Sequence, residues 1–217
     1  MNTLGDSPEL GPIFLDHLVY ATPTLETTVR YLGDTLGVTP SAGGQHPGRG
    51  TRNYLLGLGG VTYLEIIGRD PEQPDFAGTQ VFGLDGLAQA QLVGWAIRVS
   101  DIGRHIDRAR SAGYDPGPAS AMSRRLPDGY TLDWQLTHAP ESTLPVLIPF
   151  LIDWGATRHP SETASVGVTL REFHFESPDT REVQSRLAAL AITVRGEAGK
   201  NALVATIVGP RGTLTVT

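Results

Sequence analysis

The spacing of hydrophobic residues near the N-terminus predicts a strand followed by a helix. Residues 13–21 are rich in apolar and β-branched side chains, as is typical of a strand. In residues 24–36 apolar side chains recur at i, i+4, i+7 and i+11, which places them on one face of a helix. Gly37 follows, and a glycine at this point favours the left-handed conformation that ends many helices.

Two short strands are predicted after this helix. A stretch rich in glycine and proline separates the helix from strands at 53–58 and 61–67. The pair Gly59-Gly60 between these strands is typical of a hairpin turn. Residues 13–70 therefore predict the order β-α-β-β-β, and we call this segment module one.

The same pattern recurs twice along the chain, which predicts repeated structural units. Module two covers residues 91–157, and a shorter, partial third copy covers residues 166–217. Superposing the three predicted helix starts places His17, Trp95 and Glu172 at equivalent positions. The strands predicted in these two copies are 92–99, 120–125, 131–137, 144–154, 168–176, 202–208 and 213–216.

A single β-α-β-β-β unit leaves one face of its sheet uncovered, so it needs a second unit to cover that face. Modules one and two, residues 13–157, are therefore predicted to pair in an α+β fold whose two sheets enclose a concave groove. The third copy can cover an open sheet edge or form the contact of a homodimer.

The composition is that of an ordinary folded protein, and it argues against nucleic-acid binding and excludes cysteine-based sites. Of the 217 residues, 40% are hydrophobic and 18% are charged, which is far from the composition of disordered chains. The formal net charge of −6 argues against a nucleic-acid partner. Because cysteine is absent, disulfides, thiolate metal sites and a cysteine nucleophile are excluded. No signal peptide and no apolar run near the roughly 18 residues of a membrane span are recognisable, which predicts a cytoplasmic protein without a membrane partner.

Several segments resemble the glyoxalase-like group of the vicinal-oxygen-chelate superfamily. The sequences LDHLVYATPTLETTVRYLGDTLGV, HPGRGTRN and YLEIIG resemble its opening module. The sequences GWAIRVSD and LPVLIPFLIDWG extend the resemblance, which covers residues 13–160. The superfamily includes metal-dependent isomerases, ring-cleaving dioxygenases, epimerases and antibiotic-binding or antibiotic-modifying proteins. The resemblance therefore implies a fold and not one particular reaction.

In this superfamily the metal ligands usually come from the first and last strands of each module. By position, the resemblance implies His17 and Glu65 as ligands from module one. In module two the position of His17 holds Trp95, which cannot bind a metal, and the nearest acid is Asp153. The implied ligand set is therefore His17 and Glu65 with Asp153 as the third ligand, and His46 is the alternative third ligand. Such a set admits zinc, iron, manganese or nickel, and a site without metal stays open.

His17 and Glu65 are also the residues expected to carry catalysis. A buried carboxylate at position 65 needs a metal, a histidine or an arginine to balance its charge. With a metal, the ion would polarise a carbonyl group of the substrate while Glu65 or a nearby acid moves a proton. The alternative is a structural hydrogen bond between His17 and Glu65.

Two groups of residues are expected to bind a substrate. His46, Arg49 and Asn53 lie in or next to the glycine-flanked segment QHPGRGT, where Arg49 can hold a carboxylate or phosphate or can be a solvated surface side chain. In module two, tryptophans can form an apolar wall or simply pack in the core, while an arginine can add positive charge or pair with a structural carboxylate. These module-two candidates are Trp95, Trp134, Trp154 and Arg124.

The sequence thus supports two hypotheses about function. The first is a metal-dependent lyase, isomerase or oxygenase that acts on a small anionic metabolite. The second is a metal-free protein of the same fold that binds or sequesters a small molecule. The partner is a small molecule under either hypothesis.

Overall fold

The computed structural model describes residues 3–7, 11–74, 76, 78, 81–126, 128–138 and 146–217. Its elements, in chain order, are β1 (Thr3–Ser7), β2 (Gly11–Ala21), α1 (Leu25–Leu36), β3 (Ser41–His46), β4 (Thr51–Gly57), β5 (Tyr63–Arg69), η1 (Val81–Gly86), β6 (Gln91–Arg98), α2 (Ile102–Ser111), β7 (Ala119–Arg125), β8 (Thr131–Thr137), β9 (Phe150–Asp153), η2 (Pro160–Glu162), β10 (Thr169–Ser177), α3 (Thr180–Ala189), β11 (Gly196–Ala198), β12 (Ala202–Val208) and β13 (Thr213–Val216).

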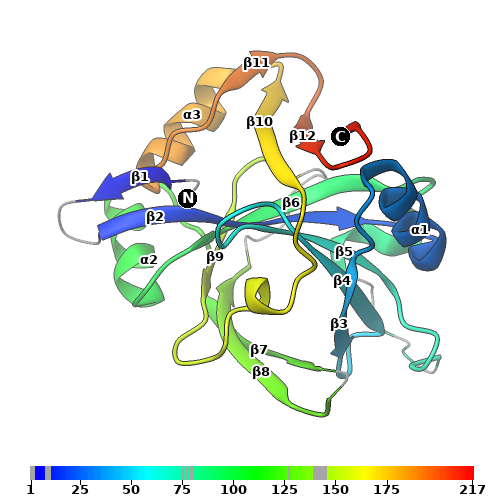
Figure 1. The fold of residues 1–217 in the computed structure, drawn as a ribbon. Helices are drawn as coiled ribbons and strands as arrows, with labels where there is room; N and C mark the ends of the chain where they lie inside the picture. Colours follow the sequence, from blue (N-terminus) through cyan, green and yellow to red (C-terminus); the bar gives the residue numbers. More distant parts are fainter. Residues whose placement is uncertain are drawn as a thin grey trace.

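Strands β2 to β9 close into a barrel (Figure 1). The order around the barrel is β2-β5-β4-β3-β7-β8-β9-β6, and β6 pairs back onto β2 in antiparallel fashion. Each half has the same arrangement, because its first strand pairs in parallel with its last, β2 with β5 and β6 with β9. At the opposite side, β3 and β7 join the two halves through the pair Gln45 and Arg125. The paired sheets predicted from the sequence are thus present as one closed α+β barrel.

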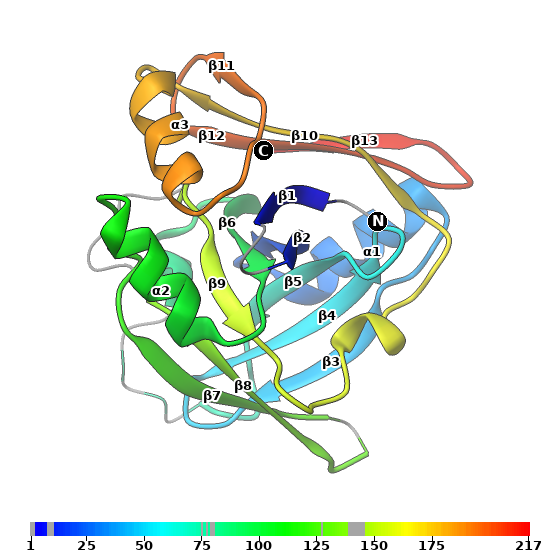
Figure 2. The same cartoon turned by 90° about the vertical axis from the view of Figure 1, so that its left-hand side faces the viewer.

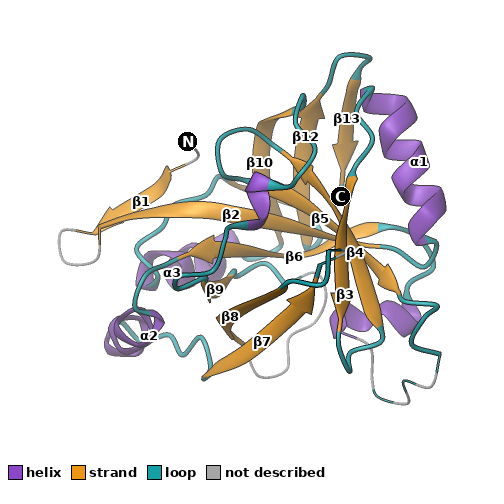
Figure 3. Cartoon of the chain, turned by 60° about the horizontal axis from the view of Figure 1, so that its bottom comes forward, coloured by secondary structure: helices purple, strands orange, loops and turns teal. Residues whose placement is uncertain are grey.

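The strands of the third copy, β10 to β13, form a separate sheet over the outside of the barrel (Figure 2). We call it the third sheet because it comes from the third copy. It has the predicted sequence order β-α-β-β-β, but its strands are arranged β11-β10-β12-β13. Its first strand, β10, therefore lies between β11 and β12, unlike β2 and β6 in their halves. Figure 3 shows β10, β12 and β13 above the barrel strands, with helix α1 beside β13. The domain boundaries proposed from the sequence stay a prediction.

The main hydrophobic core lies between the barrel wall and the third sheet. Side chains alternate along a strand, so β2 directs Leu18 to this outer core, whereas its neighbour Val19 belongs to a separate cluster inside the barrel. Trp95 on β6 lies in the outer core with its ring centroid 5.1 Å from that of Phe173 on β10. The outer face of β2 and β6 is therefore covered by the third sheet.

The predicted helices and most strands are confirmed, and the differences have local causes. Helix α1 ends at Gly37, whose φ of 81° is left-handed, as its sequence predicts. Strand β3 lies in the glycine-rich stretch where no strand was predicted, since glycine has a low strand propensity. Its glycines are required by close approach: a Cβ atom at Gly44 would lie 2.1 Å from the carbonyl oxygen of Arg125. The strand predicted at 144–154 is found only at Phe150–Asp153, and residues 139–145 lie outside the described part of the chain.

Replacing Trp95 by phenylalanine should lower the free energy of unfolding by about 2 kcal/mol. The indole is 1% exposed, and its Nε1–H donates to the carbonyl oxygen of Leu147 at 2.9 Å. Phenylalanine would leave a small cavity and a buried carbonyl without its donor. Urea unfolding measures the effect, with the exposed Tyr31 changed to phenylalanine as a control. A loss below about 0.5 kcal/mol, the usual size of a surface substitution, would contradict the packing described here.

Candidate functional site

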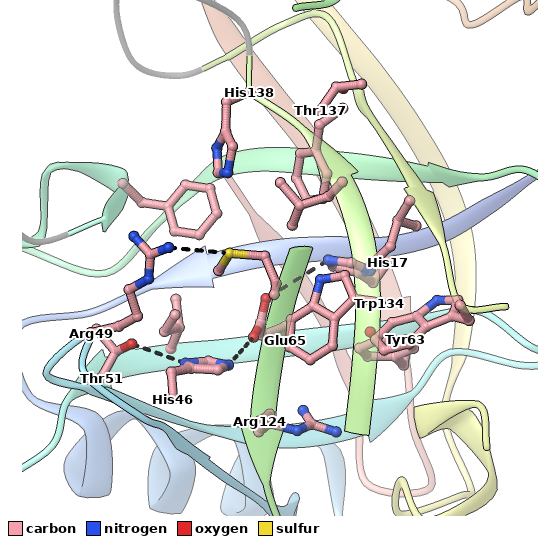
Figure 4. A pocket seen from close by; sticks show the side chains of 17 residues that line it. His17, His46, Arg49, Thr51, Tyr63, Glu65, Arg124, Trp134, Thr137 and His138 are labelled. Atoms are coloured by element: carbon pink, nitrogen blue, oxygen red, sulfur yellow. Dashed lines mark hydrogen bonds and ion pairs between the residues drawn. The ribbon is translucent and has the colours of Figure 1, made fainter. Parts of the chain in front are cut away.

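The barrel encloses a cavity of about 110 Å³ to which both halves contribute side chains (Figure 4). A buried apolar cavity of about 150 Å³ holds a benzene molecule, so this volume suits a compact group. Polar side chains gather in one part of it, and aromatic ones form much of the remaining wall. Of the residues predicted from the sequence, those lining it are His17, His46, Arg49, Glu65, Arg124, Trp134 and Trp154.

The Glu65 carboxylate lies between two histidines. Its Oε2 atom is 3.8 Å from His17 Nε2, and its Oε1 atom is 3.8 Å from His46 Nε2. Oε1 also accepts a hydrogen bond from Asn53 Nδ2. These side chains come from β2, β3, β4 and β5, so the sheet of module one assembles this part of the site (Figure 4). The predicted convergence of His17 and Glu65 is therefore present in the structure.

Asp16 forms a hydrogen bond with the Nδ1 side of the His17 ring. His17 Nδ1 lies 2.6 Å from Asp16 Oδ1, while Asp16 Oδ2 accepts from Trp154 Nε1 at 3.1 Å and lies 2.9 Å from His159 Nε2. Burial raises the pKa of Asp16, but hydrogen bonds to His159 and His17 and the charges of these histidines outweigh it and lower the pKa to about 2. An ionised carboxylate only accepts hydrogen bonds, so the proton between the two residues is on His17 Nδ1. This leaves Nε2 directed toward Glu65.

A bulge in β2 explains why Asp16 can reach the histidine beside it. Successive side chains of a regular strand point to opposite faces, but the pairing of β2 with β6 shifts register between Leu15 and His17. The hydroxyl of Thr62 donates to the carbonyl oxygen of Leu15 at 2.9 Å, next to this irregularity. Sequence analysis missed Asp16 and His159. An acid directly before a histidine is a weak signal unless the bulge is known.

His46 is a buried neutral histidine. Its Nδ1 is 2.9 Å from Thr51 Oγ1, which orients the ring toward Glu65. Burial lowers its pKa to about 4, and Arg124 and Arg49 act in the same direction, while Glu65 opposes them.

The His46 ring signal in an NMR titration should therefore stay constant from pH 8 to about pH 5 and change only near pH 4. An unfolded histidine takes up its proton near pH 6.5, so the free energy of unfolding should fall as pH drops from 6.5 toward 4. His46→Gln assigns the signal and should remove this part of the pH dependence. A midpoint between pH 6 and 7 for this signal would contradict the described burial.

Arg124 is a buried cation with unused hydrogen-bonding capacity. It lies on β7 and is 2% exposed, and its Nη1 donates to Asn53 Oδ1 at 3.2 Å. Burial lowers its pKa, whereas Tyr63 and Glu65 raise it. Its Nε and Nη2 atoms are buried without a partner in the described part of the chain, as is Trp134 Nε1. A buried donor left unpaired costs about 1–3 kcal/mol, so a bound molecule that satisfies these groups would gain affinity.

Arg49 lies at the exposed side of the cavity. Its Nη2 is 3.4 Å from the sulfur of Met122, and its side chain lines the cavity together with His138 (Figure 4). The guanidinium thus places a second positive charge beside the cavity. Trp134 and Trp154 form part of its wall, with ring centroids 5.1 Å apart.

The structure does not bring Trp95 into the cavity. Trp95 lies seven residues before α2 and Leu18 lies seven residues before α1, and both face the outer core. The register inferred from the helix starts was therefore wrong by one residue, which in a strand moves a side chain to the other face. The position that corresponds to His17 is Gly94.

Asp153 also lies away from His17 and Glu65. Its Oδ2 accepts from the backbone N–H of Ile102 at 3.2 Å, and its Oδ1 accepts from Gly155 N–H at 2.9 Å. It therefore caps the start of α2, while its neighbours Ile152 and Trp154 line the cavity. In β9 the position that corresponds to Glu65 is Phe150, because Ala96 pairs with Phe150 as Val19 pairs with Glu65.

The donor set fits two ligands of a divalent ion but not three. Two ligands that are each about 2.1 Å from one ion lie about 3.4 Å apart at a tetrahedral angle and at most about 4.2 Å apart, so His17 Nε2 and Glu65 Oε2 fit one ion. Within the described ranges, however, His17, His46 and Glu65 do not form a group whose ligand atoms all lie within 4.8 Å of one another. Since catalytic zinc sites usually have three protein ligands, the arrangement lacks one.

One such group occurs elsewhere in the part of the chain that the structure describes. It consists of His174, Glu176 and Glu197 on the third sheet, where Glu197 already pairs with Arg195.

The closed barrel with an internal cavity defines a fold of the vicinal-oxygen-chelate type. A model of the glyoxalase-like domain family matches residues 15–191. The chain belongs to this family. A comparison with curated protein sequences finds no match.

Solved structures with a similar fold share little sequence identity with the chain. A hypothetical protein from Staphylococcus aureus is 14% identical with a TM-score of 0.62, over 94% of this chain and 85% of that one. Methylmalonyl-CoA epimerase from Mycobacterium tuberculosis is 20% identical with a TM-score of 0.43, over 65% and 87% of the two chains. The Staphylococcus aureus structure supports the fold alone. In the described part of the chain, no helix is both long and apolar enough to cross a membrane.

Proposed function

We propose that the chain is a glyoxalase-like isomerase or lyase that moves a proton on a small anionic substrate in the barrel cavity. The observation that carries this proposal is the Glu65 carboxylate with the Nε2 atoms of His17 and His46 on either side of it, each at 3.8 Å. Proton transfer needs a base and an acid within reach of the same substrate. A reacting group placed in the cavity beside these side chains could contact Glu65 and a histidine together.

Two arginines support an anionic substrate. Arg124 lies deep in the cavity with two unpartnered N–H groups, and Arg49 lies at its exposed side. Burial of one positive charge beside a cavity favours a negatively charged guest, because the guest replaces the lost hydration of that charge. Arg124 and Arg49 would therefore bind and orient the substrate.

In the proposed reaction Glu65 takes a proton from a carbon next to a carbonyl group. The electron pair of that C–H bond forms the C=C bond of an enol, and the carbonyl oxygen takes a proton from Nε2 of protonated His17. Asp16 accepts from Nδ1, so it fixes the ring and balances the positive charge of His17 in this state. Delivery of a proton to the opposite face of that carbon, with return of the enol proton to His17 as the carbonyl group re-forms, completes an isomerisation. Loss of a leaving group from the next carbon, with the same return of the enol proton to His17, gives a lyase reaction.

A divalent ion, if bound by His17 and Glu65, would supply a Lewis acid for the same carbonyl oxygen. Because the third ligand is missing, we derive no step through a metal. The oxygenase alternative depends on such an ion. His17, His46 and Glu65 are of the residue types of the two-histidine, one-carboxylate iron set, but in the described structure their ligand atoms do not all lie within 4.8 Å of one another. The metal-free binding alternative is favoured by the aromatic wall of Tyr63, Phe82, Trp134, Phe150 and Trp154, which suits an apolar ligand without requiring turnover.

Deuterium exchange separates an enzyme from a binding protein. The protein is incubated with 2-oxobutyrate in D2O, and the NMR signal of the C3 protons is followed. We expect loss of this signal well above the rate without protein, and unchanged exchange after removal of metals with EDTA. Absence of exchange with tight ligand binding would support the binding protein, and exchange that EDTA abolishes and zinc restores would contradict the metal-free step.

A further inference from the structure

Among the residues that the structure describes, three buried hydrogen-bond donors around the cavity have no partner. They are Nε and Nη2 of Arg124 and Nε1 of Trp134. Both side chains line the cavity (Figure 4), and they come from the paired strands β7 and β8. Since all three groups donate, the chemistry that complements them is a cluster of acceptor oxygens.

The two free groups of Arg124 belong to one edge of its guanidinium. Nη1, on the other side, already donates to Asn53 Oδ1 at 3.2 Å. The N–H groups at Nε and Nη2 are parallel and match the two oxygens of a carboxylate, which arginine binds through two hydrogen bonds. One buried cation next to the Glu65 carboxylate suits a single negative charge better than the dianion of a phosphate monoester.

The rest of the cavity indicates the body of the ligand. Phe82, Phe150 and Trp154 contribute apolar surface, and the cavity volume is about 110 Å³. A compact hydrocarbon or aromatic group fits such a wall better than a polyhydroxylated one. Asn53 connects Arg124 to Glu65, because its amide accepts from the guanidinium and donates to the carboxylate. A carboxylate on the Nε and Nη2 edge would therefore be connected to Glu65 through the guanidinium group of Arg124 and the amide group of Asn53.

We infer that the substrate is a compact apolar monocarboxylate whose two carboxylate oxygens bind the Nε and Nη2 edge of Arg124. The ligand is a substrate only if the proposed function holds, so the inference rests on that function. Binding of the carboxylate can nevertheless be measured without turnover. Arg124 binds the carboxylate, which leaves Arg49 to attract the anion at the exposed side.

Binding of benzoate, isobutyrate and 2-oxobutyrate to the full chain tests the inference by calorimetry. We expect at least one of them to bind and benzamide, the neutral analogue of benzoate, to bind at least tenfold more weakly than benzoate. Arg124→Gln should weaken carboxylate binding at least tenfold, and Arg124→Lys, which keeps the charge but loses the paired donors, should also weaken it. Arg125→Gln is the matched control, because Arg125 is the next residue of β7 and is exposed; its affinity should equal that of the wild type.

If Arg124→Gln does not fold, NMR of the wild type decides the question. The Nε–H signal of Arg124 should shift and exchange more slowly with solvent when the bound carboxylate is added. Failure of all three acids to bind, equal affinity for benzamide, or unchanged affinity in folded Arg124→Gln would overturn the inference. Deuterium exchange that persists in that case would leave the proposed function standing, whereas carboxylate binding without exchange would remove only the proposed function.

Discussion

Replacing Glu65 by glutamine should lower the rate of deuterium exchange by about 10²–10⁴-fold, the usual contribution of a general base. Glutamine keeps the shape of the side chain and can still interact with Asn53, but it cannot take a proton from carbon. Binding of benzoate should remain or become tighter, because the substitution removes a negative charge near the proposed carboxylate site. The expected result is therefore a protein that binds carboxylates and no longer catalyses exchange.

The control for this experiment is Glu182→Gln. Glu182 is exposed on α3, where it pairs with Arg186, and the same chemical change there should leave exchange unaffected. Exchange at the wild-type rate in Glu65→Gln would show that another group is the base.

Asp16→Asn should lower the free energy of unfolding by about 3 kcal/mol, because it breaks a buried charge network. The wild-type carboxylate interacts with His17, His159 and Trp154, and an asparagine amide group would turn a donor toward donors. The substitution should also reduce exchange, since His17 loses the group that fixes its ring. Chemical denaturation and the exchange assay measure the two effects, and Asp34→Asn on the exposed surface of α1 is the control.

The pH dependence of stability distinguishes this charge from a general packing defect. The pKa of Asp16 is lowered to about 2 in the folded protein from an ordinary value of 3.8. Its contribution of about 2 kcal/mol is therefore present above pH 4 and is lost as pH falls toward 2. Asp16→Asn should lack this part of the acid-induced loss. A variant that shows the same dependence as the wild type would contradict the role assigned to Asp16.

Local patterns predicted the parts of the fold that depend on hydrophobic spacing. Helix α1 and the strands carrying His17 and Glu65 have continuous apolar patterns, and their positions agree with the prediction. Strand β3 was missed because its glycines fit a close approach to neighbouring strands, Gly43 to β4 and Gly44 to β7, which no local pattern reveals.

The family resemblance implied that His17 and Glu65 share a site, and both line the cavity. In module two, Arg124, Trp134 and Trp154 line the cavity, whereas Trp95 and Asp153 do not. Trp95 and Asp153 were misplaced because a shift of one residue reverses the face of a strand side chain. Asp16 was missed because regular alternation would place it on the opposite face of β2 from His17. A bulge at this point of β2 instead brings the two side chains together. Bulges and register follow from pairing between distant strands, so a single sequence defines them poorly.

The third sheet packs against the outer face of the strand that carries His17, although the described residues of that sheet do not line the cavity. Strand β2 presents His17 to the cavity on one side and rests Leu18 against the hydrophobic layer shared with the third sheet on the other. Weaker packing in that layer would let the backbone of β2 move. The imidazole of His17 would then no longer be held in one position relative to Glu65. Substitutions around Phe173 and Phe175, remote from any substrate, should therefore slow the reaction before they abolish folding.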